Sequence, residues 1–357
     1  MKIVHYFKSN IMAGAERVVY DIVGALKKNK NYEVAVICGG NRVKEYFDEL
    51  GVETYVHVNR NILAIKRIFT EIKPDVIHAH DNQASYLALL AGRGIPIISH
   101  IHNYYPYFET KDINYMINRI FRNRFRYNIY CSDTLKTKIV NQLPHLDNDK
   151  AIVLNNPIDV ERIIEASSIE KKWPKADDKK IVGFIGRLVK QKGLIPFINL
   201  LSPYKNELIE NNIMIIIVGE GPDKEKIMKL INNNKLKDMV QIIPYEKNPY
   251  PLIKSLALMI LPSLWEGLPI TILEAAVLKT PVLAMDVGGV SQFIHDNQTG
   301  YLCEKNNHKK FVEKMIYLLG QSHDKVVSRA FNSVKQEYGI VNYMEKLRQY
   351  YEASLLG

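Results

Sequence analysis

Short runs of apolar residues alternate along this chain with longer stretches that carry apolar residues three and four positions apart. The short runs have the length and the β-branched content of buried strands, and the longer stretches have the period of amphipathic helices. The strands predicted in the first half are Ile3–Phe7, Glu33–Cys38, Val52–His57, Val76–His80, Ile95–His100, Tyr127–Cys131 and Ala151–Leu154. Strands that alternate with helices in this way are typical of βαβ units and a parallel sheet.

The alternation stops between Ile158 and Lys180 and then starts again. A polar, proline-containing stretch fills the gap, which indicates a linker between two α/β domains. The strands predicted in the second half are Ile181–Ile185, Ile213–Val218, Val240–Ile243, Leu258–Leu261 and Val282–Ala284. We therefore expect a Rossmann-like, doubly wound domain over residues 1–165, a linker over 166–178 and a second such domain over 179–340. A final helix over 341–357 can pack back on the first domain.

Composition adds limits on the class of protein. The 357 residues are 47% hydrophobic and 24% charged, which excludes a disordered tail, a collagen-like repeat and a disulfide scaffold. The three cysteines lie far apart, without the spacing of a metal site. No apolar run reaches the ~18 residues of a membrane span, and the N-terminus is typical of a strand rather than a signal peptide, so we expect a cytoplasmic protein. The net charge of +10 suits anionic small molecules or lipid headgroups, and without a zinc, helix-turn-helix or RNA-binding motif no nucleic-acid partner is expected.

Candidate site residues are expected in the turns after the strands, because parallel α/β sheets bind ligands beyond the carboxyl ends of their strands. The turn after the first strand carries Gly14 at a helix start, where backbone N–H groups can approach an anion. The turn Ile185–Gly193 carries Arg187 and Lys192, which suit phosphate oxygens as a planar fork and a mobile charge. The alternatives are an ordinary βα turn and a solvated basic loop.

The segment Pro262–Ala275 carries two glutamates eight positions apart, Glu266 in the turn after a strand and Glu274 in the next helix. A carboxylate accepts hydrogen bonds from vicinal hydroxyls, which suits a ribose and a sugar. The free N–H groups at the helix start between the glutamates suit a phosphate. The alternative is a solvated glutamate pair.

Two other motifs are weaker. Gly219-Glu220-Gly221-Pro222 lacks the third glycine of a dinucleotide fingerprint, which argues against an NAD-binding fold. Asp147-Asn148-Asp149 spells the DxD of metal-dependent transferases, but its polar loop favours coincidence, and no metal is expected. His78 and His80 end a strand, where a packed or surface role is favoured over metal ligation.

Taken in order, the stronger motifs resemble the family 4 glycosyltransferases, which are retaining enzymes of the two-domain GT-B fold. The resemblance covers residues 3 to about 350. It rests on the Gly14-Ala15-Glu16-Arg17 turn, on Arg187 with Lys192-Gly193, on Glu266 with Glu274, and on the Val287-Gly288-Gly289-Val290 turn. The segment Val153–Asp159 resembles the family's Asn-Gly-Ile-Asp turn, with Asn156-Pro157 in place of the usual glycine.

The resemblance implies a role for each matching residue. Arg187 and Lys192 match the pair that holds the donor diphosphate. Glu274 matches the carboxylate on the nucleotide ribose, and Glu266 matches the one that touches the donor sugar. His102 matches the active-site histidine, and with Glu266, Arg187 and Lys192 it forms the expected catalytic set. The other expected site residues are Gly14, Tyr245, Gly267, Leu268, Ile270 and Thr271 on the donor side and Asn103, Tyr104 and Tyr105 on the acceptor side.

The function implied is the transfer of a hexose or N-acetylhexosamine from a nucleotide-sugar, UDP-linked by preference, to a growing envelope glycan on a lipid carrier. Retention, independence of metal and no cofactor beyond the donor are expected with it. The alternatives are a nucleotide-sugar epimerase, a soluble glycosyltransferase with a small acceptor, and a catalytically silent sugar-nucleotide-binding partner of another transferase.

One segment also favours a peripheral contact with an anionic membrane at the inner face of the cell membrane. Four aromatics lie within Tyr104–Phe108, and an apolar stripe at helical spacing follows them from Ile113 to Phe125. The window from Ile113 to Ser132 holds no acidic residue and four arginines, Arg119, Arg122, Arg124 and Arg126. The alternative is a core helix with a solvated basic side.

Overall fold

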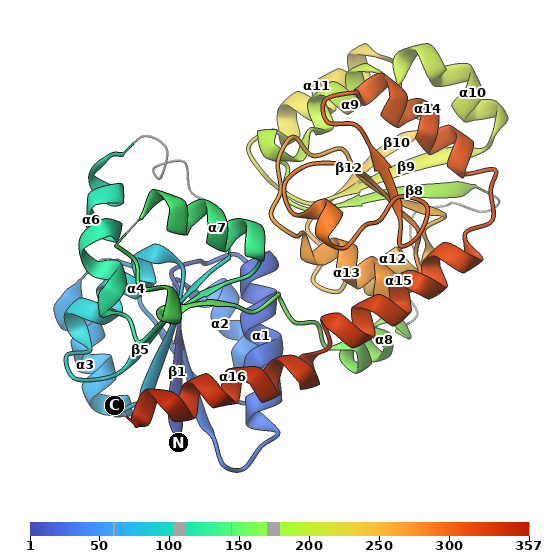
Figure 1. Cartoon of the computed structure of the whole chain (residues 1–357). Helices are drawn as coiled ribbons and strands as arrows, with labels where there is room; N and C mark the ends of the chain where they lie inside the picture. Colours follow the sequence, from blue (N-terminus) through green and yellow to red (C-terminus); the bar gives the residue numbers. More distant parts are fainter. Residues whose placement is uncertain (60, 103–110, 144, 170–178, 357) are drawn as a thin grey trace. The chain divides into compact units, whose positions relative to one another are not determined.

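The computed structural model describes residues 1–59, 61–102, 111–143, 145–169 and 179–356. The chain divides into two compact units. Unit 1 comprises Met1–Ile158 and Tyr338–Gly357, and unit 2 comprises Asp159–Glu337. Both are doubly wound α/β units with helices on both faces of a parallel sheet (Figure 1).

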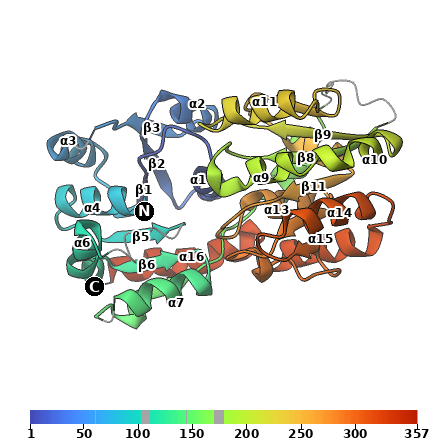
Figure 2. The ribbon, with the colours of Figure 1, turned by 90° about the horizontal axis from the view of Figure 1, so that it is seen from above.

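Unit 1 is built on a parallel seven-stranded sheet in the order β3-β2-β1-β4-β5-β6-β7, much of which can be followed in Figure 2. The strands are β1 (Lys2–Tyr6), β2 (Glu33–Cys38), β3 (Glu53–Val56), β4 (Val76–His80), β5 (Ile97–Ile101), β6 (Tyr127–Tyr130) and β7 (Ala151–Val153). The strand order reverses between β1 and β4, which makes their carboxyl ends the expected binding edge.

Helices cover both faces of this sheet. They are α1 (Gly14–Lys27), α2 (Asn41–Glu49), α3 (Ile62–Ile72), α4 (Asn82–Ala91), α6 (Ile113–Phe121), α7 (Asp133–Gln142) and α16 (Ile340–Leu355). On one face, α3 and α4 pack over a core that includes Val4, Ile77 and Phe69. On the other face, α1 and α16 contact each other, and α16 also contacts β4.

Unit 2 is built on a parallel six-stranded sheet in the order β10-β9-β8-β11-β12-β13. The strands are β8 (Lys180–Ile185), β9 (Ile213–Val218), β10 (Val240–Ile243), β11 (Leu258–Leu261), β12 (Val282–Met285) and β13 (Tyr301–Cys303). The helices are α8 (Val160–Ser167), α9 (Leu194–Asn199), α10 (Lys205–Glu210), α11 (Lys224–Asn233), α12 (Tyr250–Ser255), α13 (Ile270–Val277), α14 (His308–Leu318) and α15 (Asp324–Glu337). The order reverses between β8 and β11, so the turns after these strands meet at one edge.

The boundary between the units lies earlier than the sequence predicts. Residues 159–165 belong to unit 2, because α8 begins at Val160, is capped by the Asp159 carboxylate, and packs against α12 and α13. The chain passes from one unit to the other twice, after Ile158 and before Tyr338. The two passages are adjacent, because Ile158 pairs with Gly339 as a short parallel bridge. The final helix, α16, packs back on unit 1, where Leu347 and Tyr351 are fully buried. Most of the predicted linker lies outside the described residues.

All twelve strands predicted from the sequence are present, with ends shifted by at most two residues. The strand β13 is an addition to the predicted set. Among the described residues, no helix combines the length and apolar character that crossing a bilayer requires.

Candidate functional site

The turns at the carboxyl edge of unit 2 gather around one carboxylate. Lys192 Nζ lies 2.6 Å from Glu266 Oε1, and the Ser263 hydroxyl donates to the same oxygen at 2.7 Å. Gln191 Nε2 donates to Glu266 Oε2 at 3.2 Å. The side chains of Lys192 and Glu266 are only 15% and 5% exposed, so their attraction is shielded from solvent far more than that of a surface pair.

Two glycines allow the turns to approach this closely. Gly193 has φ +65°, and a Cβ there would overlap the carbonyl oxygen of Pro262. Gly288 has φ +59°, and a Cβ there would overlap the carbonyl oxygen of Glu266. Only glycine meets both demands, a left-handed backbone and contact with a neighbouring main chain. Glycine at these two positions is therefore explained by the close packing of the turns around Glu266.

Arg187 lies in the turn after β8 and is exposed. Within the described part of the chain its guanidinium makes no hydrogen bond or ion pair, so all of its donors are available to a ligand. Gly267, which precedes α13, accepts a backbone hydrogen bond from Gly289 at 3.1 Å. Leu268 and Ile270 are buried, and Thr271 is half-buried. Among the described residues no side chain caps the start of α13, so the first N–H groups of the helix have no side-chain acceptor there.

Glu274 lies in a separate hydrogen-bonded chain. It is 1% exposed, and the Tyr250 hydroxyl donates to its Oε1 at 3.1 Å. Arg162 Nη1 in turn donates to the Tyr250 hydroxyl at 3.3 Å, and its guanidinium lies 5.5 Å from the centre of the tyrosine ring. Sequence reasoning missed Tyr250 and Arg162, because 88 positions separate them and only the packing of α8 on α12 brings them together. Tyr245 is 43% exposed in the turn after β10.

Unit 1 holds a cavity of about 720 Å³ at the carboxyl ends of β4 and β5. Its polar wall includes Glu16, His80, Asp81 and His102, and its apolar wall includes Leu90, Ile117 and Phe121. Gly14 is exposed at the start of α1, where Glu16 accepts a hydrogen bond from the Ala13 backbone at 3.1 Å. The lining therefore offers both hydrogen-bonding groups and apolar surface.

Asp81 was not expected from the sequence and is the most strained residue of this wall. Its φ is +99°, outside the region that a side-chain-bearing residue usually adopts. Its carboxylate accepts from the Ala84 backbone at 2.7 Å and from the Lys8 backbone at 3.2 Å, which caps α4 and holds the first turn. Burial raises the pKa of Asp81 to about 6. Strain of this kind collects at functional sites.

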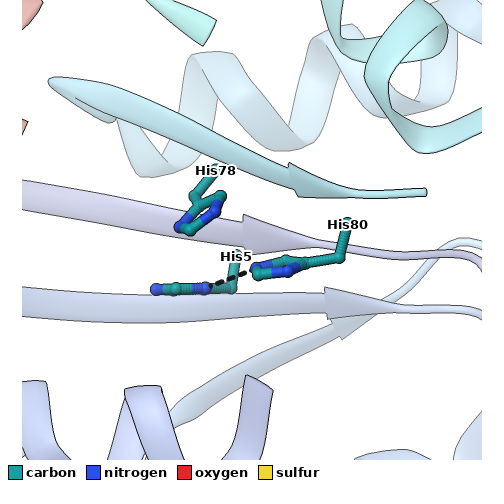
Figure 3. Close-up of side chains that lie close together, drawn as sticks. All are labelled: His5, His78 and His80. Atoms are coloured by element: carbon teal, nitrogen blue, oxygen red, sulfur yellow. Dashed lines mark hydrogen bonds between the residues drawn. The ribbon is translucent and has the colours of Figure 1, made fainter. Parts of the chain in front are cut away.

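His102 is 8% exposed and packs in a cluster of five buried histidines on β1, β4 and the end of β5. The cluster comprises His5, His78, His80, His100 and His102. Burial lowers the pKa of His102 to about 4 and that of His5 to about 3, so these rings are neutral at pH 7. Figure 3 shows His5, His78 and His80, with the hydrogen bond that joins His5 to His80.

The acceptor-side residues Asn103, Tyr104 and Tyr105 lie outside the described residues. Arg122, one of the four arginines expected either to meet anionic lipid or to lie on a solvated side, is instead 1% exposed. Its guanidinium donates to the side-chain oxygens of Asn82, Asn118, Asn128 and Ser99. Arg126 is half-buried and bonds the Ala353 carbonyl at 2.9 Å, whereas Arg119 and Arg124 are exposed.

Asp147 of the DxD-like triplet accepts the Asp149 backbone N–H at 3.0 Å and begins a short 3-10 turn. This contact gives the triplet a local structural role.

Two family models match the chain in succession. The model described as Glycosyltransferase Family 4 matches residues 12–162, and the model described as Glycosyl transferases group 1 matches residues 165–331. The chain belongs to the family 4 glycosyltransferases. It is therefore a glycosyltransferase with nucleotide-sugar donors, as the resemblance implied.

Curated relatives match the chain over most of its length. The UDP-Gal:alpha-D-GlcNAc-diphosphoundecaprenol alpha-1,3-galactosyltransferase of Escherichia coli is 24% identical over 98% of this chain and 96% of its own length. The N-acetyl-alpha-D-glucosaminyl L-malate synthase of Bacillus anthracis is 25% identical over 91% of this chain and 90% of its own length. The crystal structure of Anabaena HepE in complex with UDP and glucose superposes with a TM-score of 0.83 at 17% identity, over 99% of this chain and all of that one. The likeness confirms the GT-B fold of this glycosyltransferase.

Proposed function

We propose that this glycosyltransferase moves a hexose or N-acetylhexosamine from a UDP-sugar to a lipid-linked envelope glycan, with retention and without a metal ion. The observation that carries the proposal is the cluster at the carboxyl edge of unit 2, where Lys192 and Glu266 are held together beside the exposed Arg187. The Escherichia coli relative supports both the UDP donor and the lipid-linked acceptor, because its name gives UDP-Gal and a diphosphoundecaprenol acceptor.

The chemistry proposed for this cluster is stabilisation of the leaving diphosphate. Breaking the bond between the anomeric carbon and the phosphate oxygen adds negative charge to the phosphate and positive charge to the sugar. Arg187, Lys192 and the uncapped N–H groups of α13 supply fixed positive charge for the leaving oxygen. Glu266 would accept sugar hydroxyls, and Glu274, held by Tyr250, would accept the ribose hydroxyls.

In the step that we propose, the acceptor hydroxyl attacks from the face that the diphosphate leaves, which retains the anomeric configuration. In that geometry the leaving phosphate oxygen can take the acceptor's proton, so the proposed step needs no separate protein base. The new bond joins the acceptor oxygen to the anomeric carbon, the old bond to phosphate breaks, and the products are the glycoside and protonated UDP. His102 would lie near the sugar and bind it.

The cavity of unit 1 suits an amphiphilic acceptor. Its polar wall can bind sugar hydroxyls, and its apolar wall reaches Leu90, which is 58% exposed. Next to this wall, α6 exposes Ile113, Met116 and Ile120 at helical spacing, at 71%, 44% and 56%. The exposed Arg119 and Arg124 lie in the same segment, and basic residues near an anionic bilayer contribute ~1 kcal/mol each. We therefore propose a peripheral membrane contact through α6.

A panel of UDP- and GDP-sugars, tested for release of the nucleotide in the presence of EDTA, examines the donor half of this proposal. We expect release of UDP from one UDP-sugar, at a rate that a lipid-diphosphate-sugar acceptor increases. A catalytically silent sugar-nucleotide binder would bind the donor but release no nucleotide. An epimerase would invert the sugar without needing an acceptor. Full loss of activity in EDTA, restored by Mn²⁺, would remove the claim of metal independence and direct attention to Asp147 and Asp149.

A further inference from the structure

The five buried histidines of unit 1 lie on one face of the sheet because of strand register. His5 of β1 pairs with His78 of β4, and His80 pairs with His100 of β5. His78 and His80 are two positions apart, as are His100 and His102, so each pair projects to the same face. All five are at most 8% exposed. A neutral imidazole has one donor and one acceptor, so the hydrogen bonds of this cluster must fix which nitrogen holds the proton.

Three of the rings form a continuous ribbon joined edge to edge. His5 Nδ1 lies 2.9 Å from His80 Nε2, and the two ring planes differ by 16°. His80 Nδ1 lies 3.1 Å from His102 Nε2, with planes 20° apart. Near-parallel planes and short nitrogen–nitrogen distances are the geometry of an in-plane N–H···N bond. The first of these two bonds is drawn in Figure 3.

The end of the ribbon sets its direction. His102 Nδ1 lies 3.4 Å from the Oδ1 atom of Asn156, and a carbonyl oxygen only accepts. His102 therefore holds its proton on Nδ1 and accepts at Nε2. His80 must then donate from Nδ1 and accept at Nε2, and His5 must donate from Nδ1. Within the described residues, His5 Nε2 is buried and has no partner, as expected for the last acceptor of the series.

We infer that His5 and His80 are positioning residues that lock His102 as a neutral Nδ1–H donor, so that His102 binds a substrate hydroxyl and takes no proton. The inference rests on the proposed function, because it concerns the role of His102 in that reaction. His102 Nε2 is already occupied by the His80 proton. Within the part of the chain that the structure describes, the partner of its Nδ1–H is Asn156 at 3.4 Å, a long bond that a sugar oxygen in the cavity can replace. A neutral ring also avoids repelling the positive charge that develops on the sugar.

The same side chains lie close enough for a metal ion, since the nitrogens of His5, His78 and His80 lie within 4.8 Å of one another. Metal binding requires three lone pairs aimed at one point. In the ribbon both nitrogens of His80 are bonded to neighbouring imidazoles, and the His78 ring stacks on the His80 ring at 4.2 Å between centres. The ribbon therefore accounts for the geometry better than an ion site does.

The test compares two substitutions at one position. Asn places its Nδ2–H near the position of the imidazole Nδ1–H, so His80→Asn can keep the donor to His102, whereas His80→Leu cannot. His100→Leu is the matched control, because His100 lies on the same face and neither of its nitrogens has a partner among the described residues. The readouts are the ¹⁵N and ¹³C shifts of labelled histidines, which report the tautomer, and kcat and KM for the donor.

We expect His102 as the Nδ1–H tautomer in the wild type and in His100→Leu, and neutral at pH 6. His80→Leu should lose this tautomer and about tenfold in kcat, the scale of one neutral hydrogen bond, with donor KM unchanged. His80→Asn should restore both. A wild-type His102 in the Nε2–H form, equal losses in both His80 variants, or a shift of the imidazole signals on adding Zn²⁺ would overturn the inference. If no donor is turned over, the proposed function fails. The tautomer of His102, read from the NMR shifts, still tests the inference about the ribbon.

Discussion

At the scale of single residues, Glu266 determines how the two cations proposed to bind the diphosphate, Arg187 and Lys192, must be tested. Lys192 pairs with this nearly buried carboxylate, so Lys192→Ala would remove a charge from the donor site and also leave Glu266 with less compensation. Such a variant mixes lost catalysis with lost stability. Arg187 is exposed and makes no contact that the described fold depends on, so its substitution reports on the ligand alone.

Arg187→Ala should lower kcat by about 10²–10³-fold, the effect of removing one preorganised donor to a developing anion. The melting temperature should stay that of the wild type. Arg187→Lys is the matched control and should keep part of the activity, because it preserves the charge and loses the planar fork. Steady-state rates with the preferred donor provide the measurement. Wild-type turnover in Arg187→Ala would show that the diphosphate binds elsewhere.

Substitutions of Glu274 and Glu266 should have different effects on the affinity for UDP. Glu274→Ala should weaken binding of UDP by roughly 1.5–3 kcal/mol, the range for hydrogen bonds to a charged group. Glu266→Ala should not weaken UDP binding, because it frees Lys192 for the diphosphate, and it should reduce use of the intact UDP-sugar. Calorimetry with UDP on both variants makes the comparison.

Tyr250→Phe is the control for packing. It removes the hydrogen bond to Glu274 and keeps both the ring and the carboxylate, so the loss of UDP affinity should be smaller than in Glu274→Ala. Equal losses in the Glu274 and Glu266 variants would contradict the proposed division between ribose and sugar.

At the scale of elements, α6 is the helix whose two sides carry different roles. The buried Arg122, directly after the end of α6, ties the helix to amide and hydroxyl oxygens of α4, β5 and β6. One side of α6 leaves Ile113, Met116 and Ile120 exposed.

Replacing these three exposed residues by Gln should reduce co-sedimentation of the protein with anionic vesicles. Replacing both Arg119 and Arg124 by Gln should also reduce co-sedimentation, and it should make vesicle binding less dependent on salt.

Ile209→Gln is the matched control, because Ile209 is an exposed isoleucine of α10 in unit 2, at 55%. It should bind vesicles like the wild type. If the α6 variants also bind like the wild type, or if the wild type ignores anionic vesicles at low salt, α6 is not a membrane contact.

The sequence predicted elements well where each element carries its own period. The sequence predicts twelve of the thirteen strands that the structure describes and their alternation with helices, because buried parallel strands are short, β-branched runs. The two-residue spacing of His78 with His80 and of His100 with His102 could place each pair on one face. The sequence could not predict the order and register of β1, β4 and β5. That register brings His5, His80 and His102 together in the ribbon.

The same limit applies to the candidate site. The local motifs around Arg187, Lys192 and Glu266 were visible, and the structure joins Lys192 to Glu266. The Arg162–Tyr250–Glu274 chain was not visible, since it depends on how α8 packs in unit 2. The buried position of Arg122 was also missed, because an arginine bonded to neutral amide oxygens leaves no pattern of opposite charge.

At the scale of the whole molecule, the histidine cluster makes stability depend on pH. Burial lowers the pKa of all five rings below the unfolded value of 6.5, so the unfolded chain binds more protons below that pH. Stability should be fully present above pH 6.5 and should fall as the pH drops toward the folded pKa values, by up to about 1.4 kcal/mol per pH unit for each ring.

Asp81 opposes this trend. Its pKa is raised from 3.8 to about 6, so the folded state gains stability as the pH falls between these values. One carboxyl group, with Glu16 as its acidic neighbour, opposes five imidazoles, and the imidazoles should dominate. Urea unfolding from pH 7.5 to pH 4.5 should show a steep loss below pH 6.5. The His100→Leu variant should show a slope smaller by about one proton, and equal stability at pH 7 and pH 5 would contradict the neutral cluster.

The most direct test of the proposed reaction is the configuration of its product. A UDP-α-sugar and a diphospholipid-linked sugar acceptor are incubated with the protein in excess EDTA, and the new glycosidic bond is examined by ¹H NMR. We predict an α-linked product, formed at the same rate as without EDTA, because Arg187, Lys192 and the start of α13 stabilise the leaving diphosphate and the acceptor attacks from the face it leaves. A β-linked product, or no product until Mn²⁺ or Mg²⁺ is added, would contradict the proposed mechanism.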